Sequence, residues 1–366
     1  MAVRCGIVGL PNVGKSTLFN ALTRAGAESA NYPFCTIEPN TGVVDVPDER
    51  LEKLASTANP QRILPASQEF VDIDGLVRGA SKGEGLGNAF LANIRETDAL
   101  VQVVRCFEDE NVTHVEGGVD PARDLMTIET ELILKDMESV EKALDRHRKV
   151  ATSGNKESKN LVPILEQVNT ALNEGRWAAD AGLAPEELQA IKSFGLITLK
   201  PMLLVGNIAE HEIVRPEGNP HFAALAKLGA ERGCPVIPIC SKLEAEIQEL
   251  PAEDRPHFLE EAGLAEPGLN VLIRASFELL GLQSYFTVGP KEVRAWTVPV
   301  GATAPQAAGV IHTDFEKGFI RAQVIGYGDY VAHGGELAAK EAGKMRLEGK
   351  EYRVKDGDVM HFLFNV

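Results

Sequence analysis

The stretch GLPNVGKS, residues 9–16, decides the fold of this chain. It follows a short apolar run, Val3–Val8, and precedes a helical pattern, Thr17–Thr23. The stretch fits G-x-x-x-x-G-K-[ST], in which glycines allow backbone N–H groups to surround phosphates at a helix N-terminus. Strand, glycine loop and helix come in the required order. We therefore predict a P-loop nucleotide site in a doubly wound α/β domain.

The P-loop also predicts which atoms hold the phosphates. Lys15 is expected to reach the β and γ oxygens, and the Ser16 hydroxyl is expected to bind Mg²⁺. The remaining predicted nucleotide contacts in this loop and the first helical turn are Asn12, Val13, Gly14 and Thr17. Asn12 is also a candidate for holding a monovalent cation, K⁺, against the phosphates. The alternative for Asn12 is ordinary loop hydrogen bonding.

A second phosphate-sensing element lies in the apolar stretch Phe70–Gly75, which we predict to be a strand. Asp72 is expected to act as a Walker-B carboxylate that holds Mg²⁺ through water, and the Gly75 N–H is expected to meet the γ-phosphate. Between this element and the P-loop, Thr36 is a third candidate metal ligand. The alternative is that Thr36 belongs to a proline-punctuated surface turn.

The expected base-reading loop departs from the GTPase pattern. The apolar run Met202–Val205 leads to Asn207, Ile208 and Glu210, where Asn-Lys-x-Asp would be expected. Without the aspartate, guanine loses a bidentate charge-assisted pair, whereas the Asn207 side-chain carbonyl could accept from adenine N6. Ile208 could pack against the base or sugar. We predict a preference for ATP; the alternative is that Asn207 only stabilises the loop and base choice is loose.

A second loop is expected to lie against the nucleobase. The predicted strand Pro235–Ile239 leads to Ser241 and Lys242, where many GTP-binding proteins carry Ser-Ala-Lys. The alanine of that motif is absent. Ser241 and Lys242 are therefore candidate nucleotide contacts by position alone.

Hydrolysis needs a polar residue that orients the attacking water, and the residue after Asp-x-x-Gly cannot do this here. Many small GTPases place a glutamine directly after Asp-x-x-Gly, and here that residue is Leu76. We therefore expect slow intrinsic turnover and another polar group near the γ-phosphate. His114, in a polar loop after the predicted strand Ala99–Cys106, is the first candidate, as a side chain that could be mobile. The alternative is an ordinary surface or loop histidine.

Several long motifs resemble the YchF subfamily of Obg-like P-loop NTPases. They are GLPNVGKS, NYPFCTIEPN, DIDGLVRGASKGEGLGNAFL, VRCFEDENVTHVEGGVDPARD and NIAE. The C-terminal IHTDFEKGFIRAQV and KEYRVKDGDVMHFLFNV resemble that family's TGS domain. The resemblance implies a ribosome-associated switch protein that hydrolyses ATP to ADP and phosphate with Mg²⁺, and it supports a catalytic role for His114.

The chain divides into four predicted segments. We expect the P-loop domain in residues 1–123 and 200–280, a helical hairpin insertion in residues 124–199, and an α+β TGS domain in residues 281–366. The last boundary coincides with a change in charge. From Tyr285 to the C-terminus there are ten basic and ten acidic residues, whereas the whole chain carries a net charge of −16.

The hairpin prediction rests on apolar residues at helical spacing. One such pattern runs from Asp124 to about Ala151 and a second from Leu161 to Leu172, with Pro163 in its first turn. A polar loop, Thr152–Ser158, separates them. The two patterns predict antiparallel helices inserted into the nucleotide domain.

Composition restricts the partners. A net charge of −16 disfavours a diffuse grip on nucleic acid, so we expect no DNA partner and only local contacts with RNA. The best local basic patch comprises Lys142, Arg146, Arg148 and Lys149, followed by Lys156 and Lys159. The alternative for this patch is a solvated helix face. With the resemblance, the predicted partner is the ribosome, through rRNA contacts that we expect on the large subunit.

Location and function class follow from the same considerations. No apolar run of membrane-spanning length and no signal-peptide core is apparent, so we expect a cytoplasmic protein without membrane contact. Two alternatives to an ATPase stay open: a GTPase translation factor with relaxed base specificity, and a nucleotide-gated adaptor without significant turnover. Paired measurements of ATP and GTP affinity distinguish the GTPase from an ATPase. Comparison of turnover with a Lys15→Ala variant distinguishes the adaptor.

Overall fold

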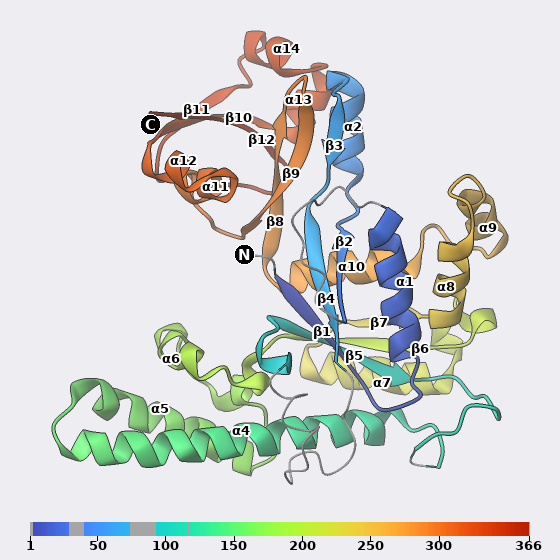
Figure 1. The fold of residues 1–366 in the computed structure, drawn as a ribbon, viewed down its shortest axis with the longest axis vertical. Coiled ribbons are helices and arrows are strands. Elements are labelled where there is room, and N and C mark those ends of the chain that lie inside the picture. Colours follow the sequence, from blue (N-terminus) through green and yellow to red (C-terminus); the bar gives the residue numbers. More distant parts are fainter. Residues whose placement is uncertain (1–2, 29–39, 74–92, 116, 366) are drawn as a thin grey trace.

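The structure is a computed structural model that describes residues 3–28, 40–73, 93–115 and 117–365. Strands in these residues form two six-stranded sheets, and a long pair of helices projects beside the first sheet (Figure 1). Three residues named above, Thr36, Gly75 and Leu76, lie outside the described residues. No helix in the described ranges is long and apolar enough to cross a bilayer.

The first sheet has the strand order β2-β4-β1-β5-β6-β7. Its strands are β1 (Arg4–Val8), β2 (Thr41–Asp45), β4 (Ser67–Asp72), β5 (Ala99–Arg105), β6 (Met202–Asn207) and β7 (Val236–Ile239). Neighbours run parallel except β2, which is antiparallel to β4. Strand β4 ends at Asp72, where its pairing with Ile7 of β1 ends, and not at Gly75 as predicted. Parallel strands bring the loops at their carboxyl ends to one edge of the sheet.

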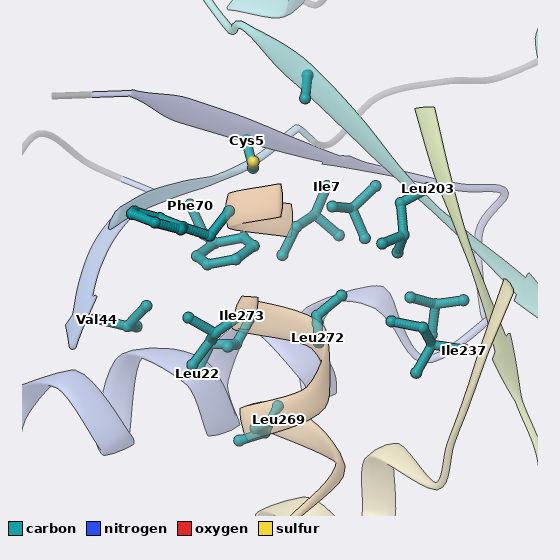
Figure 2. Packing of buried hydrophobic residues seen from close by; sticks show 14 of the residues in the cluster. Cys5, Ile7, Leu22, Val44, Phe70, Leu203, Ile237, Leu269, Leu272 and Ile273 are labelled. Carbon is teal, nitrogen blue, oxygen red and sulfur yellow. The ribbon is translucent and has the colours of Figure 1, made fainter. Parts of the chain in front are cut away.

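Helices cover both faces of this sheet. Figure 2 shows Leu22 of α1 (Lys15–Glu28) and Leu272 of α10 (Gly268–Leu279) facing Leu203 of β6 and other apolar side chains of the sheet. On the opposite face, a Cβ added to Gly206 would meet Phe222 of α7 (Pro220–Arg232). Helix α8 (Ser241–Glu249) packs beside α1. Successive residues of a strand point to opposite faces, so β6 is buried on both sides.

The long pair of helices consists of α4 (Pro121–Thr152) and α5 (Lys156–Asn173), which pack against each other (Figure 1). Helix α4 begins three residues before the predicted start because the Asp120 side chain accepts from the Arg123 N–H. Helix α5 likewise begins five residues early, where Asn155 accepts from the Ser158 N–H. Pro163 therefore lies inside α5 and not in its first turn.

A separate apolar cluster holds this pair of helices together. Its buried members come from α4, α5 and the short elements that follow them. These elements are η2 (Ala178–Ala181), α6 (Pro185–Ile191), η3 (Lys192–Phe194) and η4 (Ile197–Leu199). Between α4 and η4, the buried Asp136 carboxylate accepts hydrogen bonds from the backbone N–H groups of Ile197 and Thr198. The part of the pair farthest from the first sheet therefore has its own core.

The second sheet has the order β11-β10-β12-β8-β9-β3. Its strands are β3 (Arg62–Leu64), β8 (Leu282–Val288), β9 (Glu292–Pro299), β10 (Phe319–Gly326), β11 (Arg346–Glu348) and β12 (Asp358–Phe364). The remaining helical segments are η5 (Glu210–Glu212), η6 (Pro216–Gly218), α9 (Arg255–Glu261), α11 (Ala304–Ile311), α12 (Thr313–Lys317), α13 (Tyr327–Ala332) and α14 (Glu336–Glu341). All strands of this sheet except β3 follow residue 281.

Strand β3 and the preceding helix α2 (Glu49–Ala58) come from the N-terminal part of the chain but pack on the C-terminal sheet. The Arg50 guanidinium donates to Asp356 at 2.6 Å and lies 5.2 Å from the centre of the Phe286 ring. This arrangement differs from the predicted division, which assigns residues 1–123 to the nucleotide domain. A local sequence pattern does not reveal that a short strand pairs with a strand more than 200 residues later in the sequence.

Candidate functional site

The predicted phosphate-binding residues meet at the carboxyl edge of the first sheet. Lys15 begins α1 directly after the glycine loop, and its Nζ lies 3.9 Å from Asp72 Oδ1 at the end of β4. Both side chains are buried, whereas Ser16 and Thr17 are exposed in the first turn of α1. A hydroxyl and a carboxylate are oxygen donors of the kind that Mg²⁺ takes, and a helix N-terminus with a lysine suits phosphate.

Asn207, the predicted base reader, ties the P-loop to the adjoining loop. Its Nδ2 donates to the Val13 carbonyl at 2.8 Å, and its Oδ1 accepts from the Ser241 N–H at 3.0 Å. A Cβ added to Gly14, whose φ is +94°, would lie 2.2 Å from Asn207 Nδ2, so only glycine fits there. These bonds agree with the alternative that Asn207 stabilises the loop, although its carbonyl oxygen has a second lone pair.

The other predicted base contacts differ in exposure. Ile208 is 1% exposed and packs in the apolar core, not on an open surface of the site. Ser241 is buried beside the P-loop. Glu210 is exposed at the start of η5, and Lys242 is exposed with its Nζ 3.8 Å from Glu246 Oε1. The structure thus brings Asn207 and Ser241 to the P-loop and leaves Glu210 and Lys242 at the surface.

Arg105 organises the loop that carries the candidate catalytic histidine. It ends β5, is 2% exposed, and donates to the carbonyls of Phe107 at 3.0 Å, Asp109 at 3.2 Å and Val112 at 2.9 Å. Its guanidinium also lies 4.4 Å from the centre of the Phe107 ring. One buried cation therefore satisfies three carbonyl groups of this loop and fixes its path.

His114 follows this loop, and the residue before it, Thr113, contacts the P-loop. The Asn12 side chain donates to the Thr113 carbonyl at 3.2 Å, in agreement with the loop-bonding alternative for Asn12. The His114 side chain is 5% exposed, and its Nε2 lies 2.8 Å from Asp124 Oδ2. A buried, bonded imidazole has a defined orientation.

Cys106, between β5 and this loop, has a different chemistry. Burial raises the pKa of its thiol to about 12, and the negative charges of Asp124 and Glu212 act in the same direction. The thiol therefore stays protonated at neutral pH and is a poor nucleophile.

Two residues of this region, Arg105 and Asp124, were not singled out from the sequence. An arginine at the end of an otherwise apolar strand is the signal that could have identified the first. For Asp124, the pair Asp120-Pro121 could have located the helix start, but nothing local reveals the contact of Asp124 with His114 ten residues earlier.

Comparisons with known proteins cover the whole chain. A family model described as "50S ribosome-binding GTPase" matches residues 4–150, and the YchF GTPase C-terminal model, described as a protein of unknown function, matches residues 282–365. The chain is 59% identical over 366 residues to "Ribosome-binding ATPase YchF" of Haemophilus influenzae and 54% identical to that of Bacillus subtilis, covering 100% of each chain.

A solved structure is also similar. The Schizosaccharomyces pombe YchF GTPase has a TM-score of 0.89 and 39% identity, covering 99% of this chain and 97% of that one. The names differ in the nucleotide, since the curated relatives are called ATPases and this structure a GTPase. The α/β fold with a P-loop domain is confirmed, and so is the predicted family. With full-length relatives at this identity and matching models at both ends, the chain belongs to the YchF family.

Proposed function

We propose that this protein is a ribosome-associated, Mg²⁺-dependent ATPase that hydrolyses ATP to ADP and phosphate. The observation that carries the proposal is the meeting of Lys15 and Asp72 at the start of α1, with the P-loop held by Asn207. The names of the full-length relatives, which are ribosome-binding ATPases, support both the reaction and the partner.

We propose the following roles for the chain's own groups at the phosphate site. Lys15 compensates charge on the β and γ oxygens, and the N–H groups of the P-loop hold the same phosphates. Ser16 and Asp72 would hold Mg²⁺, with Thr36 as the third candidate ligand, and Gly75 would meet the γ-phosphate. Mg²⁺ at such a site supplies charge neutralisation of the phosphate oxygens.

His114 is proposed to orient the attacking water, because Leu76 has no polar group to do so. The Thr113–Asn12 hydrogen bond supports this role, since it joins the histidine loop to the P-loop. Asn12 keeps a second proposed role, as a ligand of K⁺. Comparing turnover in potassium and sodium salts tests that role: an equal rate in both contradicts it.

We propose a preference for adenine because the chain lacks the aspartate that forms the bidentate pair with guanine. Glu210 replaces the aspartate, and its extra methylene misplaces a carboxylate that would have to be bidentate. We expect wild-type protein to bind ATP more tightly than GTP in paired calorimetric titrations. A tenfold preference for GTP would instead establish the GTPase alternative, which the names of one family model and one solved structure favour.

The reaction itself is tested by two substitutions. Lys15→Ala should abolish measurable turnover, because it removes the main positive charge from the phosphates. His114→Ala should lower kcat by about 10²–10⁴-fold and leave ATP affinity nearly unchanged, as expected for a contact made chiefly in the transition state. If wild-type turnover does not exceed that of Lys15→Ala, the protein is a nucleotide-gated adaptor.

Ribosome contact is proposed through the projecting helices and the C-terminal domain. The exposed side chains of Lys142, Arg146, Lys149, Lys156 and Lys159 surround the end of the helix pair and suit rRNA phosphates. We propose the large subunit as the contact, a helical hairpin insertion for residues 124–199, a TGS domain for residues 281–366, and a cytoplasmic location.

A further inference from the structure

Asp124 makes a short hydrogen bond to the histidine that we propose to be catalytic. His114 Nε2 lies 2.8 Å from Asp124 Oδ2, and the two side chains are 5% and 3% exposed. The other carboxylate oxygen, Oδ1, accepts from Arg123 Nε at 3.2 Å and Nη2 at 3.0 Å. Each oxygen of the carboxylate thus has its own partner, so the carboxylate has little freedom to rotate.

The chemistry of this pair determines where the imidazole proton lies. An ionised carboxylate only accepts hydrogen bonds, so the bond requires that Nε2 carries a proton. In neutral His114 the lone pair is then on Nδ1. Such a bond, protected from solvent, orients the ring and selects one tautomer.

We propose that Asp124 is a positioning residue for His114 in ATP hydrolysis. The inference rests on the proposed catalytic role of His114 and adds a specific requirement to it. Asp124 does not touch the nucleotide; it acts by holding the imidazole with Nε2 protonated. Since Asp124 lies in the first turn of α4, the orientation of His114 depends on where that helix begins.

The elements around Asp124 have anchors besides its carboxylate. The N-cap of α4 is Asp120, whose side chain accepts from the Arg123 N–H. The path of the histidine loop is fixed by Arg105, which bonds three of its carbonyls. Replacing Asp124 should therefore change the orientation of His114 without unfolding either element.

The test is a double-mutant cycle with Asp124→Asn, His114→Ala and the double variant, with kcat and ATP affinity measured for each. We expect Asp124→Asn to lower kcat at least about tenfold with ATP affinity within about twofold of wild type, because an amide does not enforce the tautomer. In the His114→Ala background, the same change should have no further effect on kcat. Asp120→Asn is the matched control, since asparagine is also a good N-cap, and it should leave kcat unchanged.

The outcomes separate this inference from the proposed function. If His114→Ala keeps wild-type turnover, the proposed role of His114 fails and this inference fails with it. If His114→Ala loses turnover but Asp124→Asn does not, only the inference fails. Faster turnover in Asp124→Asn would mean that the carboxylate restrains His114, and an equal further loss in the His114→Ala background would mean an independent role; either overturns the proposal.

Asp124→Glu extends the test if the asparagine variant does not fold. Glutamate keeps the charge and the acceptor atoms but moves them by one methylene. We expect lower kcat with unchanged ATP affinity, because the imidazole would be displaced and not freed. Wild-type kcat in a folded Asp124→Glu variant would contradict the need for a defined carboxylate position.

Discussion

The two ends of α4 have opposite surroundings. At the N-terminal end, Asp124 is buried and bonded to His114 and Arg123. Toward the C-terminal end, Lys142, Arg146 and Lys149 are exposed, and the apolar side chains beneath them belong to a separate cluster. A buried polar contact depends on atomic position, whereas exposed charges act through their number and the salt concentration. The two ends should therefore respond to different perturbations.

The largest effect should come from removing a side chain of the separate cluster. Leu165 of α5 is fully buried in it, so Leu165→Ala should lower the free energy of unfolding of this region by about 2–5 kcal/mol. Limited proteolysis in increasing urea should show earlier cleavage of α4 and α5, with ATP affinity unchanged. Leu188→Ala is the control, because Leu188 is 38% exposed. If Leu165→Ala weakened ATP binding as well as the stability of the helix pair, the two ends of α4 would belong to one cooperative unit.

A matched pair of glycines, one in the P-loop and one after the C-terminal end of α4, tests whether atomic position matters at the nucleotide site and not at the end of the helix pair. Gly14 and Gly154 both have φ near +94°, but a Cβ at Gly14 would overlap Asn207, while nothing lies within 4 Å of one at Gly154. Gly14→Ala should weaken ATP binding by about 10²-fold, because the P-loop must shift. Gly154→Ala should show only the backbone cost of about 1–2 kcal/mol in stability and normal ATP binding. Similar ATP affinities for the two variants would contradict the comparison.

The smallest effect should come from the exposed charges. Replacing Lys142, Arg146, Arg148 and Lys149 by glutamine should weaken co-sedimentation with ribosomes and make it less dependent on salt, since fewer counterions are released. Arg148 contributes least, because its Nη2 already donates to Glu166 at 2.7 Å. ATP turnover without ribosomes should not change.

The control for this charge change is a variant with glutamine at three exposed basic residues elsewhere, Arg24, Arg215 and Lys227. It should co-sediment like wild type with an unchanged salt dependence. If the two variants behave alike, the cluster on α4 is only a solvated helix face.

Elements that depend on a local motif could be predicted from the sequence. The P-loop, strand β4 and the two long helices all have signals within a few residues of themselves, although the end of β4 was predicted three residues too late. Helix starts were misplaced by a few residues because Asp120 and Asn155 cap the helices before the apolar pattern begins.

Contacts between distant segments could not be predicted. Asn207 meets the P-loop, and Asp124 meets His114, only after the chain has folded. The burial of Ile208 also depends on packing by several elements, which a four-residue motif does not encode. The sequence therefore located the motifs better than the contacts that join them.

The position of α2 and β3 has a consequence for synthesis and for dissection of the chain. Strand β9, which pairs with β3, and strand β8, against which α2 packs, are translated only after α4, α5, β6 and β7. Residues Glu49–Leu64 therefore leave the ribosome long before the strands that they contact exist. A fragment made of residues 281–366 would likewise lack an edge strand and would uncover the apolar surface that Leu51 and Leu54 now cover. A cut at residue 281 would therefore separate the C-terminal strands from the helix and strand that pack on them.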